Sequence, residues 1–222
     1  MSSTYMTETE QVELLKAWWK RYHRLVLIGL SLIFLSISGV RYWQWHQQVI
    51  NEQASNAYEQ LMVAFSDHEI KAVRSYANQL VNTYPQTIYA DTARLVEAKL
   101  EVIAGHYDKA VLVLTKVVEH GKFNVLIDVA HLRLARIFQY QKLYKKALAE
   151  LAQVTNPSYK TNISEQKGDI FYAEGQIPKA VKAYQRAKMA NEQEGVGNSF
   201  LDMKQHEALA AAQQSSLAIQ TS

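Results

Sequence analysis

The sequence predicts an all-α protein, with a single N-terminal transmembrane helix followed by an α-solenoid of about four helix pairs. Three observations support this prediction. An uncharged apolar run covers residues 25–40, and Trp residues flank it on both sides. The whole chain has only three Pro and eight Gly, which favours helices. Beyond the apolar run, a helix–turn–helix pattern recurs at intervals of about 34 residues.

The apolar run at residues 25–40 has the length and the flanks of a membrane span. As a helix it covers about 24 Å, and a hydrocarbon core is about 30 Å thick. Aromatic residues extend it at both ends: Trp18, Trp19 and Tyr22 before it, and Tyr42, Trp43 and Trp45 after it. All four Trp of the chain lie in these clusters, as expected of aromatic belts at the two membrane interfaces. Arg24 and Arg41 can extend their charges to the headgroups.

The basic residues around this run predict its orientation. The N-terminal side carries four of them: Lys16, Lys20, Arg21 and Arg24. On the other side Arg41 is alone until Lys71. The positive-inside rule therefore places the N-terminus in the cytoplasm and the chain after about Trp45 outside it. Two alternatives remain open, a buried core helix and a cleaved signal peptide, the latter because residues 36–38 before Gly39 loosely resemble a cleavage site.

Composition argues against several kinds of function. After Trp45 the chain has 19 basic and 18 acidic residues, which argues against a nucleic-acid surface. The absence of Cys excludes thiolate zinc sites, disulfides and thiol nucleophiles. The seven His show no zinc-ligand spacing and are expected at surface or turn positions. No nucleophile elbow or Walker loop is present. We therefore expect no catalytic, cofactor or metal residues and no enzyme activity.

Three later segments, residues 105–118, 142–154 and 175–189, can be aligned with one another. Gly105, Lys142 and Gly175 fall at the start, where a tight turn is expected. Ala110, Ala147 and Ala180 align next, at spacings of 37 and 33 residues. A tetratricopeptide repeat has 34, so these segments predict the second helices of stacked tetratricopeptide-like units.

The first helix of each pair is expected before the turn, at residues 93–104, 129–141 and 163–174. Ala98, Ala135 and Gly168 take its small position, which lets paired helices approach closely. An earlier pair, residues 46–65 and 69–83, fits more loosely, and residues 198–212 are expected to cap the stack. The alternative is an unrelated helical bundle.

The predicted parts of the chain are a cytoplasmic segment 1–24 with a short amphipathic helix, a membrane segment 25–45, a repeat domain 46–212 and a flexible tail 213–222.

Several motifs resemble the ancillary SecYEG translocon subunit family of proteobacterial inner membranes. They are TETEQVELLKAWWKRY at residues 7–22, GVRYWQW at 39–45 and ASNAYEQL at 54–61, together with the degenerate repeats. The resemblance implies a single-pass inner-membrane protein with a periplasmic repeat domain. It also implies three partners: the SecYEG translocon, a membrane-anchored periplasmic chaperone of the prolyl-isomerase class, and unfolded or translocating polypeptides.

The best candidate for a binding site is the concave surface, which the first helices of stacked pairs line. The alignment turns toward it Leu95, Lys99, Val102, Leu132, Arg136, Gln139, Tyr140, Glu165, Asp169 and Tyr172. This mixture of aromatic, aliphatic and charged residues suits a peptide segment. Alternatively, the apolar members Leu95, Val102 and Leu132 pack against the next unit. We therefore expect a non-catalytic adaptor at the translocon. The rival hypothesis is an anchored scaffold for another envelope complex, in division or outer-membrane biogenesis.

Overall fold

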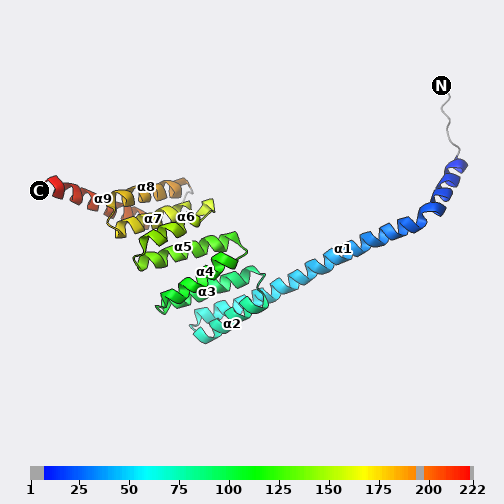
Figure 1. The fold of residues 1–222 in the computed structure, drawn as a ribbon, viewed down its shortest axis with the longest axis horizontal. Helices are drawn as coiled ribbons and strands as arrows, with labels where there is room; N and C mark the ends of the chain where they lie inside the picture. Colours follow the sequence, from blue (N-terminus) through cyan, green and yellow to red (C-terminus); the bar gives the residue numbers. More distant parts are fainter. Residues whose placement is uncertain (1–7, 194–197, 221–222) are drawn as a thin grey trace, which may run out of the picture. The chain divides into compact units, whose positions relative to one another are not determined.

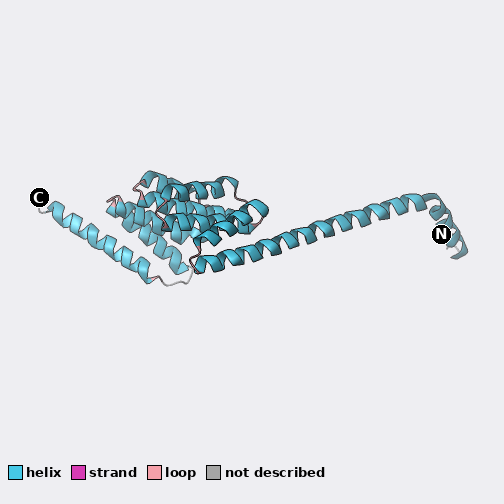
Figure 2. Ribbon diagram, turned by 90° about the horizontal axis from the view of Figure 1, so that it is seen from below, coloured by secondary structure: helices cyan, strands magenta, loops and turns pink. Residues whose placement is uncertain are grey.

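The computed structural model describes residues 8–193 and 198–220 of the 222-residue chain. These residues form nine α-helices and a short 3-10 helix, with no strand among them (Figures 1 and 2). This confirms the all-α prediction. The helices are α1 (Glu8–Ser66), α2 (Ile70–Thr83), α3 (Ile88–Ile103), α4 (Tyr107–His120), α5 (Asn124–Tyr140), α6 (Tyr144–Gln153), η1 (Pro157–Tyr159), α7 (Lys160–Ala173), α8 (Ile177–Gln193) and α9 (Ser199–Gln220).

The chain divides into two compact units between Gln53 and Ala54. Within the first unit, α1 runs without interruption from Glu8, because this stretch contains neither Pro nor a glycine-rich turn. Its apolar segment is open to the surroundings, with Leu25 65% and Leu35 69% exposed. It is long and apolar enough to cross a membrane. This exposure argues against the buried core helix, because a core helix would be covered by the protein.

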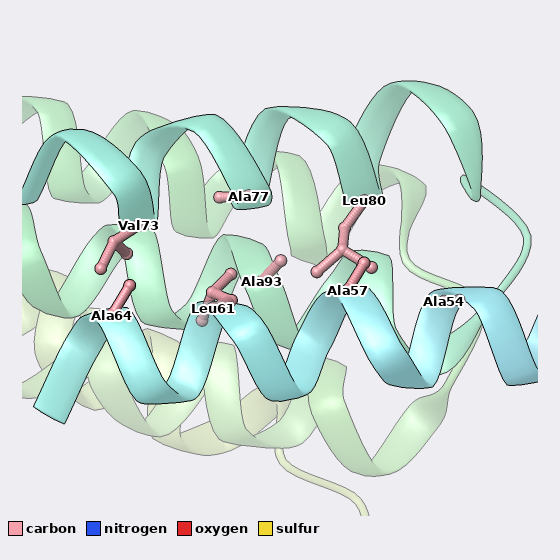
Figure 3. Packing of buried hydrophobic residues seen from close by; sticks show 8 residues of the cluster. All are labelled: Ala54, Ala57, Leu61, Ala64, Val73, Ala77, Leu80 and Ala93. Carbon is pink, nitrogen blue, oxygen red and sulfur yellow. The ribbon is translucent and has the colours of Figure 1, made fainter.

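The second unit begins with the last turns of α1, which pair with α2. Ala57, Leu61 and Ala64 of α1 lie against Val73 and Leu80 of α2 (Figure 3). Leu61 and Leu80 are fully buried, and Ala93 from α3 closes the same cluster. The small residues let the helix backbones approach closely while the larger ones fill the space between them. This pair is the first repeat, which the sequence indicated only loosely.

Three further pairs follow, α3 with α4, α5 with α6 and α7 with α8, and consecutive helices pack side by side (Figure 1). The first helices of these pairs begin earlier than expected, at Ile88, Asn124 and Lys160. Asp91, in the first turn of α3, and Asp128, near the start of α5, are both buried and lie 37 residues apart at the same repeat position. Their carboxylates accept hydrogen bonds from the connections that follow α4 and α6, respectively.

All four pairs are joined by the same turn. The residues with positive φ are His68 (59°), Gly105 (76°), Lys142 (59°) and Gly175 (78°), so the expected turn positions recur in the first pair as well. The residue after each one donates its backbone N–H to the carbonyl five positions earlier, for example His106 to Glu101 at 2.8 Å. This is the Schellman ending of a helix, and it satisfies carbonyls that the helix leaves open.

Helix α9 packs against α8 after the last pair. Its Leu201 and Ala208 are buried together with Ala180, Tyr184 and Ala187 of α8. It continues to Gln220, beyond the expected end at residue 212 and through most of the predicted tail.

One histidine also departs from the expectation that all seven lie at surface or turn positions. His131 is buried within α5 and its Nδ1 lies 2.7 Å from the Glu150 carboxylate of α6, so it belongs to the helix interface.

Candidate functional site

Three hollows lie along the first helices of the pairs and share residues with one another. Lys99 lines both the N-terminal hollow, between α1, α2 and α3, and the central hollow, between α3, α4 and α5. Arg136 lines both the central hollow and the C-terminal hollow, between α5, α7 and α9. Their volumes are about 350, 320 and 620 Å³. Neighbouring hollows thus share one lining residue each, and we call the three together the groove from here on.

The C-terminal hollow contains five of the ten residues expected on the concave surface. Arg136, Gln139 and Tyr140 come from α5, and Glu165 and Asp169 from α7. They meet because both helices are first members of their pairs and lie in neighbouring units. The same hollow also holds residues that the alignment did not indicate: Lys142, Tyr144, Gln166, Ala173, Phe200 and Lys204.

Helix α9 partly neutralises the acidic side of this hollow, with one lysine between two carboxylates. The Lys204 ammonium lies 2.8 Å from both Glu165 and Asp169, and the Tyr184 hydroxyl donates to Asp169 at 2.8 Å. Burial lowers the pKa of Lys204, but hydrogen bonds to the two carboxylates more than offset this and leave the pKa raised. Burial and the bond to Asp169 likewise raise the pKa of Tyr184. Both groups therefore keep their protons at neutral pH.

The basic side of the groove has no comparable neutralisation. Arg136 faces the neutral amide of Gln166, whose oxygen accepts from Nε at 3.1 Å in the amide orientation that satisfies both groups. Arg133 in the central hollow donates to the Leu95 carbonyl at 2.6 Å, and burial, followed by the charge of Arg136, lowers its pKa. Lys99 lies 4.9 Å from the centre of the Phe65 ring. The groove therefore presents cations beside aromatic rings, an arrangement suited to peptide carboxylates and apolar side chains.

Tyr140, which lines the C-terminal hollow, forms an aromatic pair with the half-buried Tyr107 of α4. Tyr140 is 68% exposed, and its ring centre lies 4.7 Å from that of Tyr107. A hydrogen bond between the two hydroxyls raises the pKa of Tyr107. Tyr144 donates to the Ala173 carbonyl at 3.1 Å, and this bond joins the start of α6 to the end of α7. Large rigid aromatic surfaces of this kind are frequent anchors in protein interfaces.

Five of the ten expected residues lie outside the C-terminal hollow: Leu95, Lys99, Val102, Leu132 and Tyr172. Val102 lines the central hollow with Lys99, and Leu132 is buried in the core with Ala135 and Leu151. Leu95 is only 4% exposed and packs in the core with Ala98 and Leu114, so it cannot face an open groove. Lys99 lines the two other hollows. Tyr172 bonds Glu207 of α9 at 3.0 Å, and this bond raises its pKa. The alignment could not place α9, because α9 lies outside the repeats and meets α7 across more than thirty residues of chain.

The expected membrane anchors lie in the first unit and are open to the surroundings. Trp18, Trp19, Trp43 and Trp45 are each about half exposed or more, and Arg24 and Arg41 are exposed as well. In the parts of the chain that the structure describes, no group of three or more His, Asp or Glu could hold a metal ion.

Comparison with known proteins agrees with this architecture. The family described as a tetratricopeptide repeat-like domain matches residues 16–211. Curated proteins named ancillary SecYEG translocon subunit are similar to this chain over most of its length. The one from Aggregatibacter actinomycetemcomitans is 30% identical over 82% of this chain and 88% of its own. Those from Haemophilus influenzae and Neisseria gonorrhoeae are 29% and 28% identical, over 84% and 91% of this chain and 91% and 97% of their own. The chain therefore belongs to the ancillary SecYEG translocon subunit family, with a tetratricopeptide repeat-like domain.

Proposed function

We propose that this protein is a non-catalytic adaptor of the Sec translocon, in which the repeat unit binds polypeptide segments near the membrane. The observation that carries this proposal is the groove, with Lys99, Arg136 and the exposed Tyr140 on the first helices α3 and α5 of consecutive pairs. Stacked helix pairs commonly offer such concave surfaces to peptides. The names of the relatives support the translocon as the site of action.

The anchor and its orientation belong to the same proposal. The exposed apolar segment of α1 holds the protein in the bacterial inner membrane, with the N-terminus in the cytoplasm and the repeat unit in the periplasm. Confinement near the translocon raises the local concentration of the groove, so weak binding is sufficient there. Its partners are the SecYEG translocon, emerging unfolded polypeptides and a membrane-anchored chaperone of the prolyl-isomerase class.

Affinity purification of the full chain in mild detergent tests the location. We expect SecYEG subunits and a periplasmic chaperone to be recovered together. Recovery of division or outer-membrane assembly proteins in their place would favour the rival scaffold function. N-terminal sequencing of the detergent-extracted protein belongs with this experiment, because a start near Gly39 would reveal a cleaved signal peptide and would refute the anchor.

The groove is tested by Arg136→Ala combined with Tyr140→Ala, measured by photo-crosslinking of the full chain to a translocating polypeptide. We expect crosslinking to fall about tenfold, because hot-spot residues of these types carry much of an interface's binding energy. The matched control is Leu112→Ala with Lys116→Ala, which removes an exposed apolar and a basic residue from α4. Equal crosslinking of the two variants, with unchanged circular dichroism, would contradict the proposal.

A further inference from the structure

A separate hollow between α7 and α8 has cations at four of its seven lining positions. It shares no lining residue with the groove, and its volume is about 260 Å³. Lys167 comes from α7, and Lys179, Lys182 and Arg186 come from α8. The other lining residues are Ser164, Phe171 and Ala183, so no carboxylate borders it. We call it the basic hollow.

The four cations have no acidic partner in the fold. No ion pair joins any of them to a carboxylate within residues 8–193 and 198–220. Lys179 lies 5.7 Å from the centre of the Phe171 ring, which attracts the ammonium without neutralising it. Like charges at neighbouring helix positions destabilise a helix slightly. The stability of the fold therefore does not account for four cations around one space.

The preceding helix pair supplies an internal comparison for this place. The Lys146 ammonium lies 5.7 Å from the centre of the Phe138 ring, as Lys179 does from Phe171, which fixes the correspondence at 33 residues. In the preceding pair, however, the other positions of the basic hollow hold non-basic or paired side chains. Leu134 stands in place of Lys167, Ala149 in place of Lys182, Gln153 in place of Arg186, and the bonded pair of His131 and Glu150 in place of Ser164 and Ala183. The repeat architecture therefore does not require this cluster.

We infer that the basic hollow binds an acidic segment of a polypeptide partner. The three cations of α8 lie at positions i, i+3 and i+7, which form a row of about 10.5 Å on one helix face. Such a row matches several carboxylates along a chain and is longer than one phosphate group. A hollow between two helices is also poorly shaped for a flat bilayer. Complementary charge of this kind mainly supplies specificity and fast association. The inference does not depend on the groove, because the two sites share no residue.

Fluorescence anisotropy with the full chain in nonionic detergent tests this inference. The probe is a fluorescein-labelled oligoglutamate peptide, and an oligoglutamine peptide of the same length serves as the uncharged reference. The test variant is Lys179→Glu with Arg186→Glu, two exposed residues of the basic hollow. The matched control is Lys109→Glu with Lys116→Glu, which makes the same charge change at the corresponding exposed positions of α4.

We expect the wild type to bind oligoglutamate in preference to oligoglutamine, with an affinity that falls as salt is raised. In the test variant the Kd should rise about tenfold or more, and in the control about twofold at most. Equal losses in the two variants would show that only net charge matters and would overturn the inference. It would also be overturned if inorganic phosphate, or phosphatidylglycerol mixed into the micelles, displaced the probe as well as unlabelled oligoglutamate does. Circular dichroism at 222 nm confirms that the variants are folded.

Discussion

At the scale of single residues, the contact between Gly168 and Tyr184 distinguishes the last helix pair from the others. In the second and third pairs an alanine and a leucine occupy these two positions: Ala98 with Leu114, and Ala135 with Leu151. In the last pair, a Cβ atom built on Gly168 would lie 2.5 Å from the Tyr184 ring, which is itself buried. The loss of one methyl group on α7 therefore makes room for a larger ring on α8.

We predict that Gly168→Ala lowers the free energy of unfolding by about 1–3 kcal/mol, because overpacking forces side chains out of their preferred positions. Adding Tyr184→Leu should recover part of this loss, since it recreates the pairing of the second and third units. The measurement is a double-mutant cycle from urea unfolding of the four proteins. Additive effects of the two substitutions would contradict the steric explanation. Tyr184→Leu alone also removes the hydrogen bond to Asp169, and the cycle corrects for that loss.

At the scale of elements, each buried aspartate ties the start of the first helix of a pair to the connection that follows the second helix of the same pair. The Asp128 carboxylate is 2% exposed and accepts the backbone N–H of Thr155 at 2.9 Å and of Asn156 at 3.0 Å. Asp91 holds Lys122 in the same way through one bond of 3.1 Å. These bonds satisfy backbone donors in segments that belong to no helix.

We predict that Asp128→Ala lowers the free energy of unfolding by about 1–3 kcal/mol, because two backbone donors lose their acceptor. Asp128→Asn keeps one acceptor oxygen and should cost less. Both are measured by urea unfolding, with Glu119→Ala on the exposed face of α4 as the control, expected to change stability by less than about 0.5 kcal/mol. If Asp128→Ala were as stable as the control, the carboxylate would not hold the connection.

The local sequence pattern was sufficient to predict the repeats, because it depends on two features that recur at fixed positions: the turn residues and the small residues. The turn position of Gly105 and Gly175 follows from backbone geometry, and small residues on paired helices follow from close packing. The expected helix starts missed the beginnings of α3 and α5, where the reason for Asp91 and Asp128 is a contact with a distant connection.

The candidate site also divides into residues that the repeat pattern could assign and residues that it could not. Arg136 and Tyr140 could be assigned to the concave side because the same face of the first helix recurs in each repeat. Leu95, by contrast, shares a helix face with Lys99 but is covered by its neighbours, and spacing along one helix cannot show which member is covered. The contributions of Phe200 and Lys204 depend on where α9 docks, which no repeat pattern describes.

At the scale of the whole molecule, the proposed function depends on which side of the membrane receives the repeat unit. Four basic residues precede the apolar segment, Lys16, Lys20, Arg21 and Arg24, and only Arg41 follows closely. Retention of basic residues on the cytoplasmic side decides the orientation of a single span. The groove and the basic hollow can meet translocating polypeptides only if this bias sends the repeat unit outward.

We predict that replacing these four residues with Gln reduces export of the repeat unit severalfold, because Arg41 would then be the only basic residue next to the span. Alkaline phosphatase fused after Ser222 is active only outside the cytoplasm, so its activity per fusion protein measures export. The control replaces Lys109, Lys116, Lys145 and Lys146 with Gln, which removes equal charge far from the span and should leave the activity unchanged. A wild-type fusion that is inactive, while a cytoplasmic β-galactosidase fusion at the same site is active, would reverse the proposed orientation. Peptide binding by the groove would then have to occur in the cytoplasm.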